Sequence, residues 1–414
     1  MVQSPLSDQG AAPEKKAAHF SYIDGLRGAA ALYVVLHHFS LWNTTGLPRW
    51  ANLVFGWTLY GHLAVAVFIT LSGFCLMLPV TRSADQRLRG GCVLYIKRRA
   101  WRILPPYYAA LVLALAVAAF SPQGLAWLHG EHQPGSSQWL SNFSAGNVVS
   151  HVFVLHNLSE RWATSLDMAL WSIATEWQIY FFFPLLLLPV WRKFGAFAAV
   201  VAGFAFGMAP HVLLPHGKNF DWACPWYLGL FALGMTCAVL LQRGVFGNKR
   251  AALLPWTTLL FAGLYFATKL LYAGSEVGEN DPVRWLKDAL AGFIAASVIL
   301  SCAVAANGGG NRLLRVFEHR RLVGLGTWSY SLYLTHCLVL QEMLTMQRFC
   351  HFFGVTALLL RVLVGIPASL ALAYLFFLVF ERPFLSGRNS FSAAGRRQNS
   401  VAEAAHAAAI FPAP

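Results

Sequence analysis

Residues 21–42 read SYIDGLRGAAALYVVLHHFSLW, a stretch apolar enough to span a membrane that still contains Asp24, Arg27, His37 and His38. A charged side chain inside a spanning helix costs about 3 kcal/mol on insertion scales, so such residues usually have a function. The step from Arg27 to His38 is about three helical turns, so both share one face roughly 16 Å apart, with His37 about 80° away. The alternative is an arginine that anchors the helix end and histidines that pack between helices.

The composition of the whole chain indicates a polytopic membrane protein of the all-α class. Of its 414 residues, 57% are hydrophobic and only 12% are charged, and the mean hydropathy is +0.53. Soluble domains carry about 25% charged residues, so this chain has too few to cover a globular surface. Its net charge of +14 could suggest nucleic acid, but that would need a basic patch on one face. The positive residues instead alternate between loops, so we expect the lipid bilayer, and no nucleic acid, as a partner.

Windows of about 20 apolar residues predict ten transmembrane helices. They cover residues 21–42, 59–79, 103–121, 168–190, 195–214, 223–242, 253–272, 286–306, 326–346 and 355–380. With both termini in the cytoplasm, the inner segments hold 22 of the 31 Lys and Arg residues, the outer loops hold five and the spans hold four. This imbalance follows the positive-inside rule and predicts a multi-pass protein of the plasma (inner) membrane.

Three regions follow from this pattern. Residues 1–20 are polar and predict a disordered cytoplasmic tail, residues 21–385 form the transmembrane domain, and residues 386–414 predict a second disordered cytoplasmic tail. No small-residue cleavage site follows the first apolar run, so we expect it to remain as a helix. Residues 147–156 are apolar but too short to span, and predict a re-entrant or interfacial segment.

An arginine cluster precedes the third predicted span, in the sequence YIKRRAWRILPPYY. Arg98, Arg99 and Arg102 lie in its last turn before Pro105 and Pro106. Guanidinium groups bind phosphate oxygens in a bidentate way, so the cluster suits a phosphorylated ligand at the cytoplasmic surface. Contact with lipid headgroups explains such a loop equally well.

The fourth and ninth spans each carry polar residues on one face. Glu176 follows Ser172 by one turn, and helix depth places Glu176 within a turn or two of His38, so a His–carboxylate pair is one hypothesis. A protonated Glu176 bonded to a backbone carbonyl is the alternative. His336 lies mid-span with Tyr333 on the same face, and cross-helix hydrogen bonding explains such a stripe about half the time.

Two smaller observations complete the candidate set. Ser72 and Gly73 lie in the core of the second span, where small residues allow close backbone approach. The seven cysteines show neither metal spacing nor a disulfide pattern, and the outer-loop histidines lack zinc-ligand spacing, so we expect no metal site.

Together these residues resemble the acyltransferase-3 family of integral membrane acyltransferases. The resemblance rests on six motifs in family order over residues 21–385: Asp24-Gly25-Leu26-Arg27-Gly28 with His38, Phe68-Ile69-Thr70-Leu71-Ser72-Gly73-Phe74, Arg98-Arg99-Ala100-Trp101-Arg102, Leu170-Trp171-Ser172 with Glu176, Tyr330-Ser331-Leu332-Tyr333-Leu334-Thr335-His336, and Glu381-Arg382-Pro383. Where the family usually has a glutamate pair, this chain has Glu176-Trp177, so Glu176 alone can fill that role.

The resemblance implies O-acyl transfer, with acyl-CoA (acetyl-CoA by preference) as a cytoplasmic co-substrate and no permanently bound cofactor. The acceptor would be a hydroxyl of a carbohydrate or another extracytoplasmic or membrane-associated molecule. By similarity Arg27 and His38 are essential, and Arg98, Arg99 and Arg102 suit the CoA phosphates. An acceptor hydroxyl needs a general base near neutral pKa, which assigns His38, with Glu176 or His336 orienting it.

Several roles stay open at this point. Arg27 can hold the pantetheine or pyrophosphate end of CoA or pair with Asp24, while Ser72, Ser172 and Tyr333 are expected to support the site. Direct transfer and a covalent acyl intermediate fit the residues equally. A proton-coupled transporter, which also uses intramembrane His, Glu and Arg, is the main alternative, although the chain shows no repeated halves with matching broken helices.

Overall fold

The computed structural model describes residues 20–40, 47–120, 144–214, 217–271, 283–308 and 310–386, and the regular elements in these ranges are all helical. The longer helices are α1 (Ser21–Phe39), α3 (Gly61–Arg82), α4 (Gly91–Phe120), α7 (Leu170–Phe182), α8 (Leu188–Leu213), α9 (Tyr227–Gln242), α11 (Leu254–Leu271), α12 (Arg284–Gly308), α15 (Ser329–Phe349) and α17 (Ile366–Phe376). The all-α prediction is therefore confirmed. The tails predicted for residues 1–20 and 386–414 lie, except for their innermost residues, outside the described part of the chain.

Shorter helical pieces connect or extend these helices. They are α2 (Arg49–Phe55), η1 (Gly56–Leu59), α6 (Ala145–Val152), η2 (His156–Leu158), η3 (Phe183–Leu187), η4 (Gly217–Ala223), α10 (Asn248–Ala251), α13 (Arg312–Phe317), α14 (Arg320–Thr327), α16 (Gly354–Leu360), η5 (Arg361–Gly365), η6 (Phe377–Glu381) and α18 (Arg382–Ser386).

Six stretches of the described chain are long and apolar enough to cross a membrane. They are Arg49–Arg82, Gly91–Phe120, Leu170–Leu213, Phe220–Gln242, Arg284–Gly308 and Gly354–Leu385. Many large apolar side chains on these helices are exposed, as expected of surfaces that face lipid rather than water. The protein is therefore an integral membrane protein with at least these candidate spans.

The stretch Leu170–Leu213 cannot be one straight span. Its 44 residues would extend about 66 Å at ~1.5 Å per residue, roughly twice the ~30 Å hydrocarbon core. Gly195 interrupts it with φ 88° and ψ 179°, a conformation that L side chains rarely adopt. The chain changes direction there, at the boundary predicted between residues 168–190 and 195–214.

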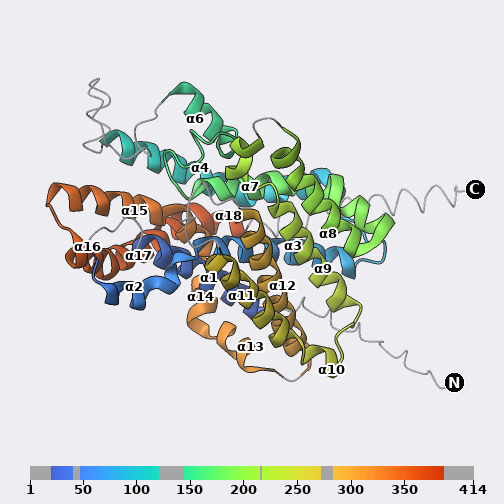
Figure 1. The fold of residues 1–414 in the computed structure, drawn as a ribbon. Helices are drawn as coiled ribbons and strands as arrows, with labels where there is room; N and C mark the ends of the chain where they lie inside the picture. Colours follow the sequence, from blue (N-terminus) through green and yellow to red (C-terminus); the bar gives the residue numbers. More distant parts are fainter. Residues whose placement is uncertain are drawn as a thin grey trace, which may run out of the picture.

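Helices α1, α3 and α12 lie in the middle of the bundle, between α15 and α17 on one side and α7, α8 and α9 on the other (Figure 1). The most extensive packing joins α3 to α9, α1 to α14, and α8 to α9. In the α3–α9 crossing, a Cβ at Gly73 or Gly234 would collide with the backbone of the other helix. This close approach confirms the small-residue interpretation of Gly73 and fixes α3 at the centre of the fold.

The N-terminal half of α1 is clamped by α14. A Cβ on Gly28 would collide with the carbonyl of Leu322, and a Cβ on Gly326 would collide with the carbonyl of Asp24. The glycine next to Arg27 in the first motif thus has a packing function: it lets the two backbones meet. The arginine is held on a helix whose position is set by backbone contact rather than by flexible side chains.

Two predicted segments differ from the structure in extent. The helix α4 begins at Gly91 and runs through Pro105 and Pro106. Arg98, Arg99 and Arg102 therefore lie inside a helix and not in the last turn of a loop. Residues 147–156 are split between the short helix α6 and a turn, and Tyr107 and Tyr108 of α4 donate hydrogen bonds of 2.8 and 2.9 Å to its backbone carbonyls. This segment packs against the middle of α4.

Candidate active site

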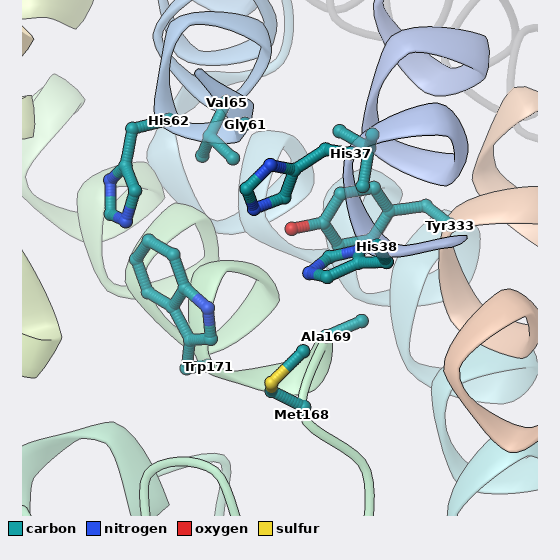
Figure 2. A pocket seen from close by; sticks show the side chains of 10 residues that line it. His37, His38, Gly61, His62, Val65, Met168, Ala169, Trp171 and Tyr333 are labelled. Carbon is teal, nitrogen blue, oxygen red and sulfur yellow. The ribbon is translucent and has the colours of Figure 1, made fainter. Parts of the chain in front are cut away.

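A cavity opens between the end of α1, the start of α3, the start of α7 and the middle of α15 (Figure 2). Its empty volume is about 360 Å³, including space open to solvent. His37 and His38 reach it from α1, His62 from α3, Trp171 from α7 and Tyr333 from α15. We call it the imidazole cavity, because three of its lining residues are histidines.

The protonation pattern of two histidines follows from their hydrogen bonds. Nδ1 of His336 lies 2.8 Å from the carbonyl of Tyr333 and 3.1 Å from that of Leu332. Both partners are acceptors, so Nδ1 carries a proton and Nε2 of the neutral ring carries a lone pair. That Nε2 lies 3.0 Å from Nδ1 of His38, which must therefore donate. In this pattern the lone pair of the neutral His38 ring is on Nε2, and the ring lines the cavity.

His37 is held differently. Its Nδ1 donates to the backbone carbonyl of Thr58 at 2.8 Å, and its ring packs directly on Gly61, where a Cβ would collide with it. The helical-face argument separates the partners of His37 and His38 correctly, since only His38 bonds His336. It does not remove His37 from the cavity, which both rings line (Figure 2).

Two supporting residues meet beside the cavity. The hydroxyl of Ser172 on α7 lies 2.6 Å from the hydroxyl of Tyr333 on α15. This bond joins the helices that carry the fourth and ninth predicted spans, and it orients the Tyr333 ring, which lies against Phe68 of α3. The direct contact between Ser172 and Tyr333 is consistent with their predicted supporting role.

One group of possible metal ligands occurs among the described residues. The ligand atoms of His38, His336 and Cys337 lie within 4.8 Å of one another, and Cys337 Sγ is 3.3 Å from His336 Nε2. Two imidazoles and a thiolate are a ligand set that Zn²⁺ accepts. In the observed geometry, however, His336 Nε2 already accepts from His38, so a hydrogen-bonded dyad accounts for the same contacts.

A second group of predicted residues gathers near the other end of α1. Arg27 lies 3.5 Å from Asp24 and 3.7 Å from the thiol of Cys75, and it interacts electrostatically with Glu176. Arg102 interacts with both Arg27 and Arg99. We call Arg27, Arg99 and Arg102 the arginine cluster. These guanidinium groups repel one another, and the carboxylates of Asp24 and Glu176 interact with Arg27 while that of Glu381 interacts with Arg102.

Two further observations define this cluster. The Nε atom of Arg99 is buried and has no hydrogen-bond partner among the described residues, which marks a donor left for a ligand. Arg98 faces away, since its guanidinium reaches the backbone carbonyl of Arg89 at 3.4 Å. The predicted set of three on α4 therefore divides, with Arg99 and Arg102 in the cluster and Arg98 outside it.

Glu176 lies near the arginine cluster and does not line the imidazole cavity. Its carboxylate accepts from the hydroxyl of Tyr180, which in turn lies 3.1 Å from the hydroxyl of Ser72. Of the two partners considered for His38, the structure supplies His336, whereas Glu176 interacts with Arg27. The reason is depth: Glu176 lies closer to the start of α1 than the span boundaries suggested.

The sequence motif containing Glu381 did not predict its partners, and sequence reasoning missed His62 and Asp288. Glu381 is buried, its carboxylate accepts from the amide and hydroxyl of Ser331, and it interacts with Arg102. His62 and Asp288 form an ion pair of 3.5 Å at the imidazole cavity. An acidic residue in an apolar span is a usable signal for Asp288, but nothing local connects it to a histidine 226 positions earlier in the sequence.

The short segment after α6 carries a separate set of buried groups. The rings of His151 and His156 stack with centroids 3.9 Å apart and planes 8° apart. Burial lowers the pKa of His151 to about 4 and raises the pKa of Asp167 to about 7. Asp167 still accepts from the backbone amide of Ala169, next to the imidazole cavity, at 2.8 Å.

The comparisons with known proteins agree with these sites. The model of an acyltransferase domain, the acyltransferase-3 model, matches residues 20–378. The chain belongs to the acyltransferase-3 family. The match covers most of the chain and includes both the arginine cluster and the imidazole cavity.

Individual relatives are distant. The chain is 26% identical to acyltransferase MdmB of Streptomyces mycarofaciens over 77% of its own length and 78% of the relative's. It is 24% identical to nodulation protein 10 of Rhizobium leguminosarum bv. viciae, covering 95% of this chain and all of that protein. Against the peptidoglycan O-acetyltransferase OatA of Listeria monocytogenes it is also 24% identical, but it spans only 48% of that protein. No solved structure matches the chain.

Proposed function

We propose that this acyltransferase-3 protein is a membrane O-acyltransferase that moves an acetyl group from acyl-CoA to a hydroxyl of a carbohydrate or another extracytoplasmic acceptor. The observation that carries the proposal is the His336–His38 hydrogen bond, which supports a His38 tautomer with its lone pair on Nε2, in a ring that lines the imidazole cavity. A base of this kind, oriented by a second group, is what an unactivated hydroxyl needs.

The chemistry of the proposed step is direct acyl transfer. Nε2 of His38 takes the hydroxyl proton while the acceptor oxygen attacks the acyl carbonyl carbon. The carbon–sulfur bond then breaks, and the thiolate of CoA leaves and recovers the proton from the His38 imidazolium.

The arginine cluster is the proposed site for the anionic part of acyl-CoA. Arg99 offers a buried, unpartnered Nε, and Arg27 and Arg102 add charge beside it. Arg27 and His38 are separated by about 16 Å along α1. A donor held by its phosphates at one end can therefore present its acyl end at the other through an extended arm.

We also propose ten spans with both termini in the cytoplasm of a cell bounded by a plasma (inner) membrane. Counting the kinked stretch Leu170–Leu213 as two and adding α1, α11 and α15 to the six apolar stretches gives ten. The charge imbalance between alternate loops supports this orientation. The names of OatA and its relatives support O-acetylation as the reaction class, and membership of the family weighs against the transporter alternative.

The test uses the purified full chain in nanodiscs with acetyl-CoA labelled in the acetyl group. We expect release of free CoA and transfer of label to an oligosaccharide hydroxyl, abolished in His38→Ala. His38→Ala with undiminished turnover would refute the role of His38, and a wild-type protein that never consumes acetyl-CoA would refute the proposed function. Turnover that is lost on chelation, with bound zinc found by elemental analysis, would instead assign His38, His336 and Cys337 to a metal.

A further inference from the structure

The three histidines of the imidazole cavity differ in what lies behind them. Nδ1 of His37 faces a backbone carbonyl, and Nδ1 of His38 faces the neutral imidazole of His336. Nδ1 of His62 lies 3.5 Å from Oδ1 of Asp288 and 3.3 Å from the hydroxyl of Tyr227. Among these Nδ1 contacts of the three rings, the one to a carboxylate belongs to His62.

We propose that His62, with Nδ1 directed at the carboxylate of Asp288, donates a hydrogen bond from Nε2 to the acyl carbonyl oxygen and stabilises the oxyanion formed when the hydroxyl attacks. This inference rests on the proposed function and adds a second catalytic residue to it. His38 would then be the base, His62 the electrophilic group and Asp288 the residue that positions His62.

Asp288 is a buried acidic residue that requires polar partners. Its side chain is 2% exposed, and Oδ2 accepts from Nε1 of Trp226 at 2.9 Å. An ionised carboxylate away from water is costly unless it is paired with a cation. His62, with a side chain 34% exposed, is the partner of Asp288 that also reaches the cavity. The His62–Asp288 pair therefore connects a buried carboxylate to an imidazole ring that lines the cavity.

Charge around the pair leaves room for a cation on His62. Arg284 lies one turn before Asp288 on α12 and interacts with both Asp288 and Asp221. The cation of Arg284 thus serves two carboxylates, and its guanidinium is drawn towards Cys224 at 3.3 Å and over the ring of Trp222. Asp288 places a carboxylate next to Nδ1 of His62, whereas Nδ1 of His37 faces the carbonyl of Thr58 and Nδ1 of His38 faces the ring of His336.

The ring of His62 is also held in place. It stacks on Trp171 with centroids 5.6 Å apart and planes 27° apart, and both rings lie at the edge of the cavity in Figure 2. With Nδ1 turned to Asp288 and Tyr227, Nε2 is the nitrogen left for a substrate oxygen. The 3.5 Å contact is long for a hydrogen bond, and such contacts commonly shorten when the reacting complex forms.

The step balances without another reactant. As the acceptor oxygen bonds to the carbonyl carbon, the π electrons move onto the carbonyl oxygen, which accepts the Nε2–H of His62. When the carbon–sulfur bond breaks, the carbonyl re-forms and His62 keeps both of its protons. His62 is thus neither consumed nor changed during turnover, in contrast to His38, which gains and loses a proton.

The test compares His62→Ala, His62→Gln and Asp288→Asn with a matched control, His211→Gln. His211 lies 2.8 Å from Asp221, near Arg284 and Trp226, but does not line the cavity, so it reports the cost of losing a His–Asp contact in the same region without removing a group from the cavity. Steady-state kcat and KM for acetyl-CoA are measured at saturating acceptor. A carbonyl-labelled ketone analogue of acetyl-CoA is then bound to each protein, and its carbonyl stretch is recorded by infrared difference spectroscopy.

Loss of one oxyanion donor typically lowers kcat by about 10²- to 10³-fold. We expect a loss of that size in His62→Ala, with a smaller loss in His62→Gln and Asp288→Asn and little change in KM. The red shift of the carbonyl stretch should disappear in His62→Ala and shrink in Asp288→Asn, and His211→Gln should match the wild type in both readouts.

Three results would overturn the inference: His62→Ala with kcat within about threefold of the wild type, an unchanged carbonyl stretch, or an equal loss in His211→Gln. If His62→Ala does not fold, the near-isosteric Asp288→Asn decides by the same two readouts. A wild-type protein with no acetyl transfer would refute the proposed function itself, and the inference with it, whereas normal wild-type transfer with an unaffected His62 variant refutes the inference alone.

Discussion

Replacement of His336 tests whether it orients His38. His336→Phe keeps a planar ring in the buried site but removes the acceptor for Nδ1–H of His38, now 3.0 Å from Nε2 of His336. Removing one partner of a buried hydrogen bond costs about 1–3 kcal/mol, towards the lower end here because His38 also has a backbone hydrogen bond to Val34, and His38 can avoid that cost by turning its ring or moving its proton to Nε2. Either change removes the base from the cavity.

The expected loss follows from that range. At about 1.4 kcal/mol per factor of ten, 1–3 kcal/mol lowers the fraction of correctly oriented His38, and with it kcat, by roughly 5- to 150-fold. The KM for acetyl-CoA should hardly change, because the arginine cluster lies at the other end of α1. The assay is acetyl transfer in nanodiscs with kcat and KM determined separately.

His336→Gln is the matched variant, since its amide oxygen can still accept from His38. We expect it to retain more activity than His336→Phe. Equal losses in the two variants, with equal thermal midpoints, would refute the orienting role, as would a His336→Phe protein within threefold of the wild-type kcat.

Three other predictions follow from the described contacts. Arg99→Gln should raise the KM for acetyl-CoA with little change in kcat. Arg98→Gln removes a guanidinium directed at a backbone carbonyl and should leave the KM unchanged. Equal KM values in the two variants would indicate that Arg99 contacts lipid headgroups instead. Gly28→Ala should lower the thermal midpoint, because overpacking costs about 1–3 kcal/mol, whereas Gly324→Ala has open space and should be neutral or stabilising. Burial raises the pKa of Asp167 to about 7, against about 3.9 unfolded, so the contribution of this carboxyl to stability should fall as pH rises from about 4 through 7, opposite in sign to the contribution of His151. Asp167→Asn should remove this dependence, so its midpoint gains on the wild type across that window; a constant difference would contradict the assignment.

The features that sequence reasoning can reach are set by local geometry. The distance between Arg27 and His38 depends only on helix pitch, and the break near Gly195 depends on one residue without a Cβ. The placement of Glu176 depended instead on the relative depth of two helices, where an error of a turn or two moves a side chain from one site to the other. That error grows with every uncertain span boundary.

Pairs of residues on helices far apart in the sequence could not be predicted, for a different reason. Asp288 meets His62 only because α12 packs against α3, and a single sequence contains no information on which helices become neighbours. The division of Arg98 from Arg99 is similar: both lie on α4, and the direction of each side chain is decided by neighbouring elements, such as the loop carbonyl of Arg89.

The clamped helix α1 also bears on how the membrane stays sealed. Its N-terminal half is fixed by backbone contact with α14, so the separation of the arginine cluster from the imidazole cavity cannot vary much during turnover. If a donor spans that interval, its charged head can remain on one side while only a thin, uncharged arm enters the protein. The enzyme would then need no large opening between compartments, and ions would find no continuous path through it while groups are exported one at a time.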